Sequence, residues 1–202
     1  MQLRKKIKCL NNPEYVKIGD KKYKINTDFR VALECNKIAQ DKNINDVERA
    51  LAIIYKLYGD EGLNDIENHN ELLRLAIKYL GLGKEVEKTN EEPDMDFEQD
   101  MDYIETSFMS DYGIDLANTK MHWWKFYNLI NGLSNSELGN CCVLNRVRNL
   151  RRFDVSTIKD SKERQKIIDA QRSVALKKKE PELTEKQLQS VEEIIRLAGL
   201  DK

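Results

Sequence analysis

The pattern of hydrophobic and polar positions predicts one short strand pair followed by helices. Residues 15–18 and 23–25 alternate apolar and polar side chains around a turn at 19–22, as a β-hairpin does. From residue 29 on, apolar side chains recur at intervals of three and four, the period of a helix that covers a core. The pattern therefore predicts a mainly α protein, in which a short N-terminal β-hairpin precedes a multi-helix bundle in two parts.

Residues that favour helix starts and ends divide the chain further. Asn45 with Glu48 three residues later resembles a capping box, in which each side chain bonds a free backbone N–H of the first turn. In the first part, helices are expected to start at Thr27 or Asp28, at Asn45 and near Asp65, and the last two to end at Gly59 and Gly81. In the second part, helices are expected over residues 97–112, 121–130, 134–147, 167–175 and 184–198.

Between the two parts, residues 84–96 carry many charges and almost nothing to bury. Such a composition favours a linker over a packed element. We predict a hairpin plus helical domain over 1–83, an acidic linker over 84–96 and a C-terminal helical domain over 97–202.

The charge of the chain is balanced overall but not locally. The 202 residues contain 34 basic and 35 acidic side chains, for a net charge of −1. Residues 81–115 hold twelve acidic and two basic side chains, whereas 146–179 hold twelve basic and four acidic ones. These oppositely charged segments could pair within one chain or between chains, and a solvated helix face is the simpler interpretation of each. The basic segment has few aromatic side chains, so we expect no binding of nucleic acid.

Composition also argues against catalysis, metal binding and membrane insertion. His69 and His122 are the only histidines, and the four cysteines form no Cys-x-x-Cys pair. No phosphate-binding loop or hydrolase motif occurs. No stretch approaches the about 18 apolar residues of a membrane span, and no signal peptide is apparent. We expect a soluble, intracellular protein that is not an enzyme, has no cofactor and binds no metal and no membrane.

The most distinctive feature is the aromatic segment 121–130. On a helix, positions i, i+3, i+4 and i+7 form one apolar stripe, which contains Trp123, Phe126, Tyr127 and Ile130. Trp124 lies about 100° away from Trp123, at the margin of this stripe. The stripe could be a core face or a partner-binding face. Our candidate partner-binding residues are Trp123, Trp124, Phe126 and Tyr127, and Trp124 is favoured because tryptophans often anchor interfaces.

Three blocks of sequence resemble a known family. They are Tyr23-Lys-Ile-Asn-Thr-Asp-Phe-Arg30, the run from Phe97 to Leu116, and Met121-His-Trp-Trp-Lys-Phe-Tyr-Asn-Leu-Ile-Asn-Gly-Leu133. Together they are similar to the phage "gene product fifteen" family of siphophages and prophages of Gram-positive bacteria. The resemblance covers roughly residues 13–180.

The resemblance implies a tail assembly chaperone, which binds the phage tape measure protein and helps to recruit the major tail protein. It implies action in the host cytoplasm during assembly and absence from the mature virion, and it brings no catalytic residues. The alternative is a virion structural protein, such as a tail or connector component. The sequence leaves open whether the chain forms a homo-oligomer, which half contacts which partner, and whether a frameshift produces it.

Overall fold

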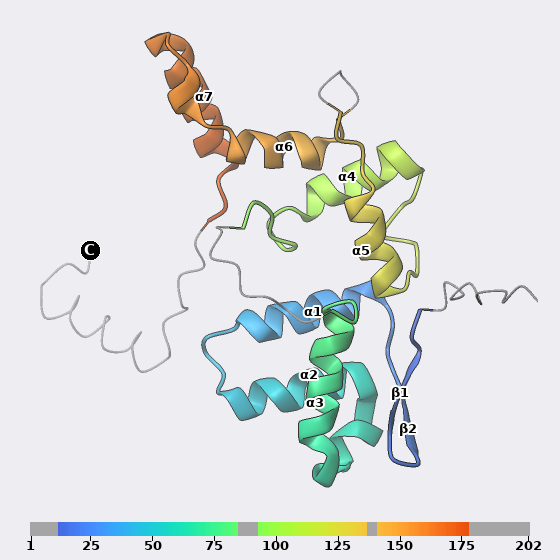
Figure 1. The fold of residues 1–202 in the computed structure, drawn as a ribbon. Coiled ribbons are helices and arrows are strands. Elements are labelled where there is room, and N and C mark those ends of the chain that lie inside the picture. The colour runs from blue at the N-terminus through green and yellow to red at the C-terminus, as the bar shows by residue number, and fades with distance from the viewer. Residues whose placement is uncertain (1–11, 85–92, 137–140, 178–202) are drawn as a thin grey trace, which may run out of the picture.

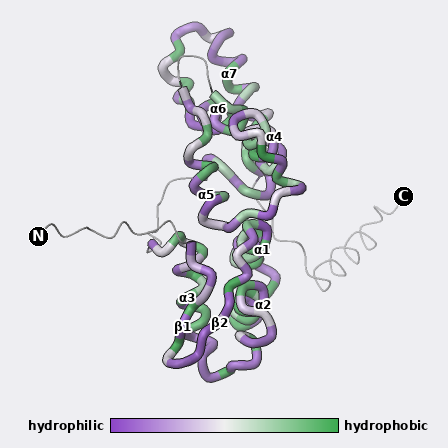
Figure 2. Tube along the Cα trace, turned by 90° about the vertical axis from the view of Figure 1, so that its right-hand side faces the viewer, coloured by the Kyte–Doolittle hydropathy of each residue, from purple (hydrophilic) through white to green (hydrophobic). Residues whose placement is uncertain are grey.

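The computed structural model describes residues 12–84, 93–136 and 141–177. Its elements stack along one long direction, with the hairpin and the first three α-helices at one end and α7 at the other (Figures 1 and 2). The expected last helix over 184–198 lies outside the described residues. The buried apolar side chains pack between the elements, and Figure 2 marks the apolar positions along the chain in green.

The hairpin consists of β1 (Tyr15–Ile18) and β2 (Lys21–Lys24), which pair antiparallel. Ile18 faces Lys21 across the pair, so the turn contains only Gly19 and Asp20 and is shorter than predicted. Gly19 has φ 57°, in the left-handed region that two-residue hairpin turns need. The hairpin is confirmed, and β2 begins two residues earlier than its apolar pattern indicated, because Lys21 and Lys22 are both exposed and interrupt the alternation of apolar and polar residues.

The first part contains three α-helices and one short 3-10 helix. They are α1 (Phe29–Gln40), α2 (Asp46–Asn64), η1 (Ile66–Asn68) and α3 (His69–Leu80). Asp28 caps α1, and the predicted capping box at the start of α2 is present, with Asn45 and Glu48 bonding reciprocally. The first helical stretch of α2 ends at Gly59 as predicted, because Gly59 has the non-helical φ 66° and ψ −158°. A second stretch follows across this kink and extends α2 to Asn64.

The second part contains α4 (Met101–Tyr112), α5 (Trp123–Asn131), α6 (Val143–Arg152), η2 (Val155–Thr157) and α7 (Ser161–Val174). The helix predicted from residue 97 begins later, because the Asp96 carboxylate accepts the backbone N–H groups of Glu98 and Gln99 in a turn. The helix predicted from Ser134 or Ser136 begins only after Cys142, which serves as its N-cap.

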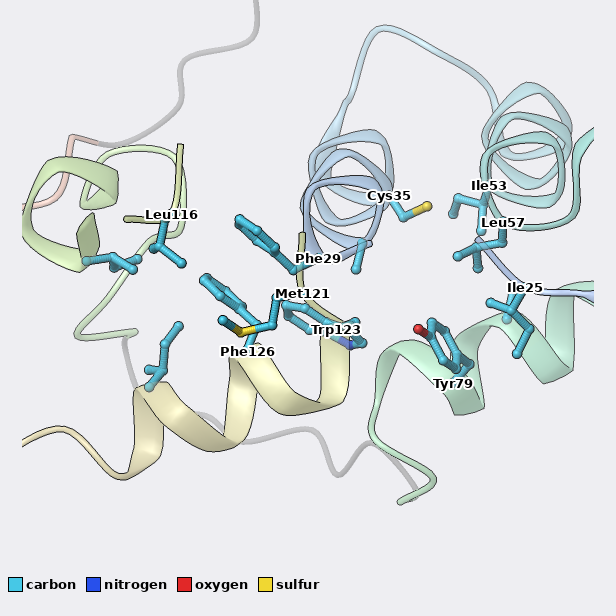
Figure 3. Close-up of a cluster of buried hydrophobic side chains, with 14 of the residues drawn as sticks. Ile25, Phe29, Cys35, Ile53, Leu57, Tyr79, Leu116, Met121, Trp123 and Phe126 are labelled. Carbon is cyan, nitrogen blue, oxygen red and sulfur yellow. The ribbon is translucent and has the colours of Figure 1, made fainter. Parts of the chain in front are cut away.

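The buried side chains of both parts form one hydrophobic cluster. Phe29 of α1 stacks on Phe126 of α5 with ring centroids 4.4 Å apart (Figure 3). Phe108 of α4 also stacks on Phe126, with ring centroids 5.3 Å apart. The fold class is thus confirmed, a mainly helical protein with an N-terminal hairpin. The division of the chain into two domains stays a prediction. Among the described residues, both predicted domains contribute side chains to this one core.

A short backbone junction starts two helices from the same point. The Phe29 N–H donates to the Met121 carbonyl at 2.9 Å, and the Trp123 N–H donates to the Thr27 carbonyl at 2.8 Å. These bonds form an antiparallel bridge between Asp28 and His122, directly before α1 and α5. The junction therefore fixes the aromatic helix against the first part of the protein.

The acidic and basic segments pair within one chain. The Asp100 carboxylate, 1% exposed, accepts two hydrogen bonds of 2.7 Å from the Arg151 guanidinium. Asp94 forms ion pairs with Arg148 at 2.9 Å and with Arg152 at 2.6 Å. Within the predicted linker 84–96, Asp94 therefore belongs to an ion-pair network with α6, and residues 85–92 lie outside the described residues.

Candidate functional site

The aromatic helix α5 presents its four candidate residues to two different environments. Trp123 is 2% exposed and Phe126 is fully buried, so both side chains belong to the core. Trp124 and Tyr127 are partly buried and pack against the core from its edge. The burial thus separates the four candidates into two core residues, Trp123 and Phe126 (Figure 3), and two residues with accessible surface, a distinction that the sequence alone left open.

Both indole groups bond the C-terminal end of α3. Trp123 Nε1–H donates to the Leu80 carbonyl at 3.0 Å, and Trp124 Nε1–H donates to the Tyr79 carbonyl at 2.9 Å. The last carbonyls of a helix have no partner within the helix, so side-chain donors stabilise them. The Trp124 ring also lies over the Tyr79 ring, with centroids 6.1 Å apart. These contacts hold Trp124 in one orientation at the surface.

His122 positions the start of this helix. Its Nδ1 accepts the Trp124 backbone N–H at 3.1 Å, so the ring serves as the N-cap of α5. Its Nε2 lies 3.1 Å from the Pro13 carbonyl, to which it donates in the tautomer that leaves Nδ1 free to accept. His122 thus ties the segment before β1 to α5 and has a structural role.

Trp124 forms one wall of a small apolar pocket between the hairpin, α3 and α5. The pocket has a volume of about 290 Å³. It is lined by Pro13, Tyr15, Val16, Lys17, Ile25, Leu75, Lys78, Tyr79, Gly83 and Trp124. Gly83 has φ 77°, and a Cβ on it would meet the Trp124 ring at 3.3 Å, so glycine lets the chain pass close to the indole. We call this feature the hairpin pocket.

A second, larger hollow of about 980 Å³ lies on the side of α2. Its walls come from residues 24–28, 55–60 and 120–122, around the kink at Gly59. Its lining carries both charge signs, and two of the lining residues, Lys56 and Glu34, form an ion pair of 2.6 Å. Tyr55, 49% exposed, supplies its largest accessible apolar side chain. Sequence reasoning missed this hollow, and the glycine at the predicted end of the second helix was the available signal.

Burial or hydrogen bonding within the fold shifts the pKa values of Cys35, Asp65 and Cys141. Burial raises the pKa of the Cys35 thiol to about 12, so this side chain is not a nucleophile at neutral pH. Asp65 receives hydrogen bonds from Lys21, Tyr23 and Asn68, which lower its pKa to about 2. Desolvation raises the pKa of Cys141. Cys9 lies outside the described residues.

Within residues 12–84, 93–136 and 141–177, the cysteines are free, and no three His, Cys, Asp or Glu side chains are grouped as a metal ion would need. No helix in these ranges is both long and apolar enough to cross a membrane.

Comparison with known proteins identifies the family. The profile of the family described as Bacteriophage Gp15 protein matches residues 10–176. The chain belongs to the bacteriophage Gp15 protein family. The match includes the hairpin, the aromatic helix α5 and every other helix and strand of the described residues. The resemblance of the three sequence blocks to this family is therefore confirmed. Neither the curated proteins nor the solved structures searched contain a match to the chain.

Proposed function

We propose that this phage protein is a tail assembly chaperone, which binds the tape measure protein, helps to recruit tail tube subunits and catalyses no reaction. The observation that carries the proposal is membership of the Gp15 family over residues 10–176, because the sequence resemblance to that family implies this role. On this proposal the protein acts in the host cytoplasm and leaves before the virion is complete.

The surface offers features that suit binding of another polypeptide. The hairpin pocket is apolar and contains a fixed tryptophan, and the larger hollow beside α2 contains the exposed Tyr55. Aromatic side chains held at the edge of a groove are common anchors of protein interfaces. Exposed apolar side chains also occur on α2, α3 and α4, at Val47, Ile77 and Met109. A chaperone needs such accessible apolar surface to cover apolar stripes of an unassembled client.

The test is co-expression with the tape measure protein and the major tail protein of the same phage, followed by affinity purification and light scattering. We expect a soluble complex of defined mass with the tape measure protein, which by itself is insoluble or degraded. Purification of the protein free of both, while both behave normally alone, would refute the chaperone role.

Mass spectrometry of purified virions separates the chaperone from a structural component. A chaperone should be absent or far below one copy per tail. A stoichiometric amount in the particle would instead assign the protein to the tail or connector.

A further inference from the structure

Strand β1 has an open edge. Ile25 N–H donates to the Glu14 carbonyl at 2.8 Å, and the register pairs Val16 with Tyr23 and Ile18 with Lys21. In an antiparallel pair, the residues that exchange hydrogen bonds alternate with those that do not. The backbone N–H and C=O groups of Tyr15 and Lys17 therefore point away from β2, and among the described residues no hydrogen bond reaches them.

The hairpin pocket lies along this open edge. Among the described residues the sheet consists of β1 and β2. Strand β2 packs against α2, while β1 lies on the side toward α3 (Figure 2). The edge residues Tyr15 and Lys17 line the pocket together with Leu75 on α3 and Trp124 on α5. A polypeptide that paired with β1 would thus place alternate side chains over an apolar hollow.

The charge around the pocket selects among such polypeptides. The residues that line it include Lys17 and Lys78, both exposed, and no acidic residue. Lys22 adds a third positive charge beside the edge, with its Nζ 3.7 Å from the centre of the Tyr15 ring. Lysines on an edge strand disfavour pairing of two copies of the same edge, because the charges repel. They favour a strand that carries carboxylates.

We propose that the β1 edge and the hairpin pocket form a docking site for an extended segment of a partner protein, which adds a third strand beside β1. The segment places a bulky apolar side chain against Val16, Leu75 and Trp124. Acidic side chains two residues away lie on the same face of the added strand and reach Lys78. Main-chain bonds supply affinity in this mode of recognition, and the pocket supplies specificity. The proposal is independent of the tail assembly role.

The probe is the acetylated and amidated peptide Glu-Thr-Glu-Thr-Leu-Thr-Glu-Thr-Glu, titrated into the full chain and followed by calorimetry and by NMR of backbone amides. We expect binding that weakens with salt, and we expect the Tyr15 and Lys17 amides to become protected from solvent exchange. Replacing the central leucine by alanine should weaken binding by about tenfold, since the pocket loses its occupant. A peptide with lysine in place of glutamate should not bind.

Backbone methylation of the peptide tests the strand geometry directly. Successive N–H groups of a strand point to opposite edges, so N-methylation of the odd-numbered residues and of the even-numbered residues blocks different edges. We expect one of the two methylated peptides to lose binding and the other to keep it. Loss with both peptides, or with neither, would overturn strand addition.

Two protein variants test the site from the other side. Lys17→Pro removes an N–H that β2 does not use, so the hairpin should persist while binding falls by about tenfold or more; Lys17→Thr, which keeps the N–H, should lose less. Lys78→Glu should weaken binding several-fold, and Lys162→Glu on α7 should not change it. Circular dichroism melting verifies that each variant is folded. Equal binding by Lys17→Pro and the unaltered chain would overturn the proposal, as would a dimer that Lys17→Pro dissociates, because the edge would then belong to a second copy.

Discussion

The buried ion pair between Asp100 and Arg151 provides the sharpest test of how the acidic and basic segments hold the second part together. Asp100 precedes α4 and is 1% exposed, whereas Arg151 lies on α6 and is 10% exposed. The guanidinium donates to both carboxylate oxygens at 2.7 Å, in the bidentate geometry that arginine favours. Arg151 also donates to the Val174 carbonyl at 2.6 Å, which attaches the end of α7.

Asp100→Ala removes the carboxylate and leaves a mostly buried cation. Breaking a buried pair in this way costs about 3–5 kcal/mol. Arg151 keeps its bonds to the carbonyls of Val174 and Asp94, so we expect a value near the lower end, about 3 kcal/mol. For a chain of this size, such a loss corresponds to a melting temperature lower by about 6–12 °C.

Urea denaturation followed by circular dichroism measures the free energy of unfolding of Asp100→Ala, Arg151→Ala and the double variant. The double variant should lose less than the sum of the single ones by about 1–3 kcal/mol, because the second change removes an already unpaired group. The control is Asp169→Ala, whose exposed pair with Arg172 spans 3.4 Å, and we expect a change within about 0.5 kcal/mol. A loss below about 1 kcal/mol for Asp100→Ala, or additive effects in the cycle, would refute this reasoning.

Three further outcomes follow from the same structure. Trp124→Phe should lower the free energy of unfolding by about 1 kcal/mol, because the Tyr79 carbonyl loses its indole donor. An unchanged melting temperature would show that this hydrogen bond does not stabilise the protein. Gly59→Ala should destabilise the protein by about 1–3 kcal/mol through backbone strain alone, since a Cβ there meets no atom within 4 Å, and a urea titration that finds no loss would contradict the kink. Folding lowers the pKa of Asp65 from 3.8 to about 2, chiefly through the hydrogen bond from Lys21. The ionised carboxylate therefore stabilises the protein above pH 4, and this stabilisation is lost as the pH falls toward 2. Acid titration of Asp65→Asn should lack this loss of stability between pH 4 and 2.

The features that the sequence predicted well are those decided by neighbouring residues. The N-cap at Asp28 and the capping box of Asn45 and Glu48 depend on side chains within one turn, so their spacing was sufficient. The start of α6 was predicted too early because the true cap is Cys142, whose sulfur accepts from the Asn145 N–H at 3.4 Å. Cysteine is not among the preferred caps, so no local signal marked this position.

Features decided by distant contacts were out of reach. The continuation of α2 past Gly59 depends on packing, and the Leu57 carbonyl beside the kink accepts from the Asn26 N–H at 2.7 Å, a contact between residues 31 positions apart. The pairing of Asp100 with Arg151 likewise joins segments that the sequence could only describe as oppositely charged. Charge totals indicate that two segments attract, and they do not specify which atoms meet or in which chain.

The aromatic helix shows how far a local pattern leads toward a site. The angle of about 100° between successive helix positions separated Trp124 from the stripe, and the structure places Trp123 and Phe126 in the core and Trp124 at its edge. The same angle lets the two indoles reach successive carbonyls, Leu80 and Tyr79, at the end of α3. The pocket beside Trp124 also needs residues from the hairpin and from α3, which only the fold brings together. The sequence therefore separated Trp124 from the core residues but not Tyr127, and the backbone junction before α1 and α5 determines what the accessible surface of Trp124 faces.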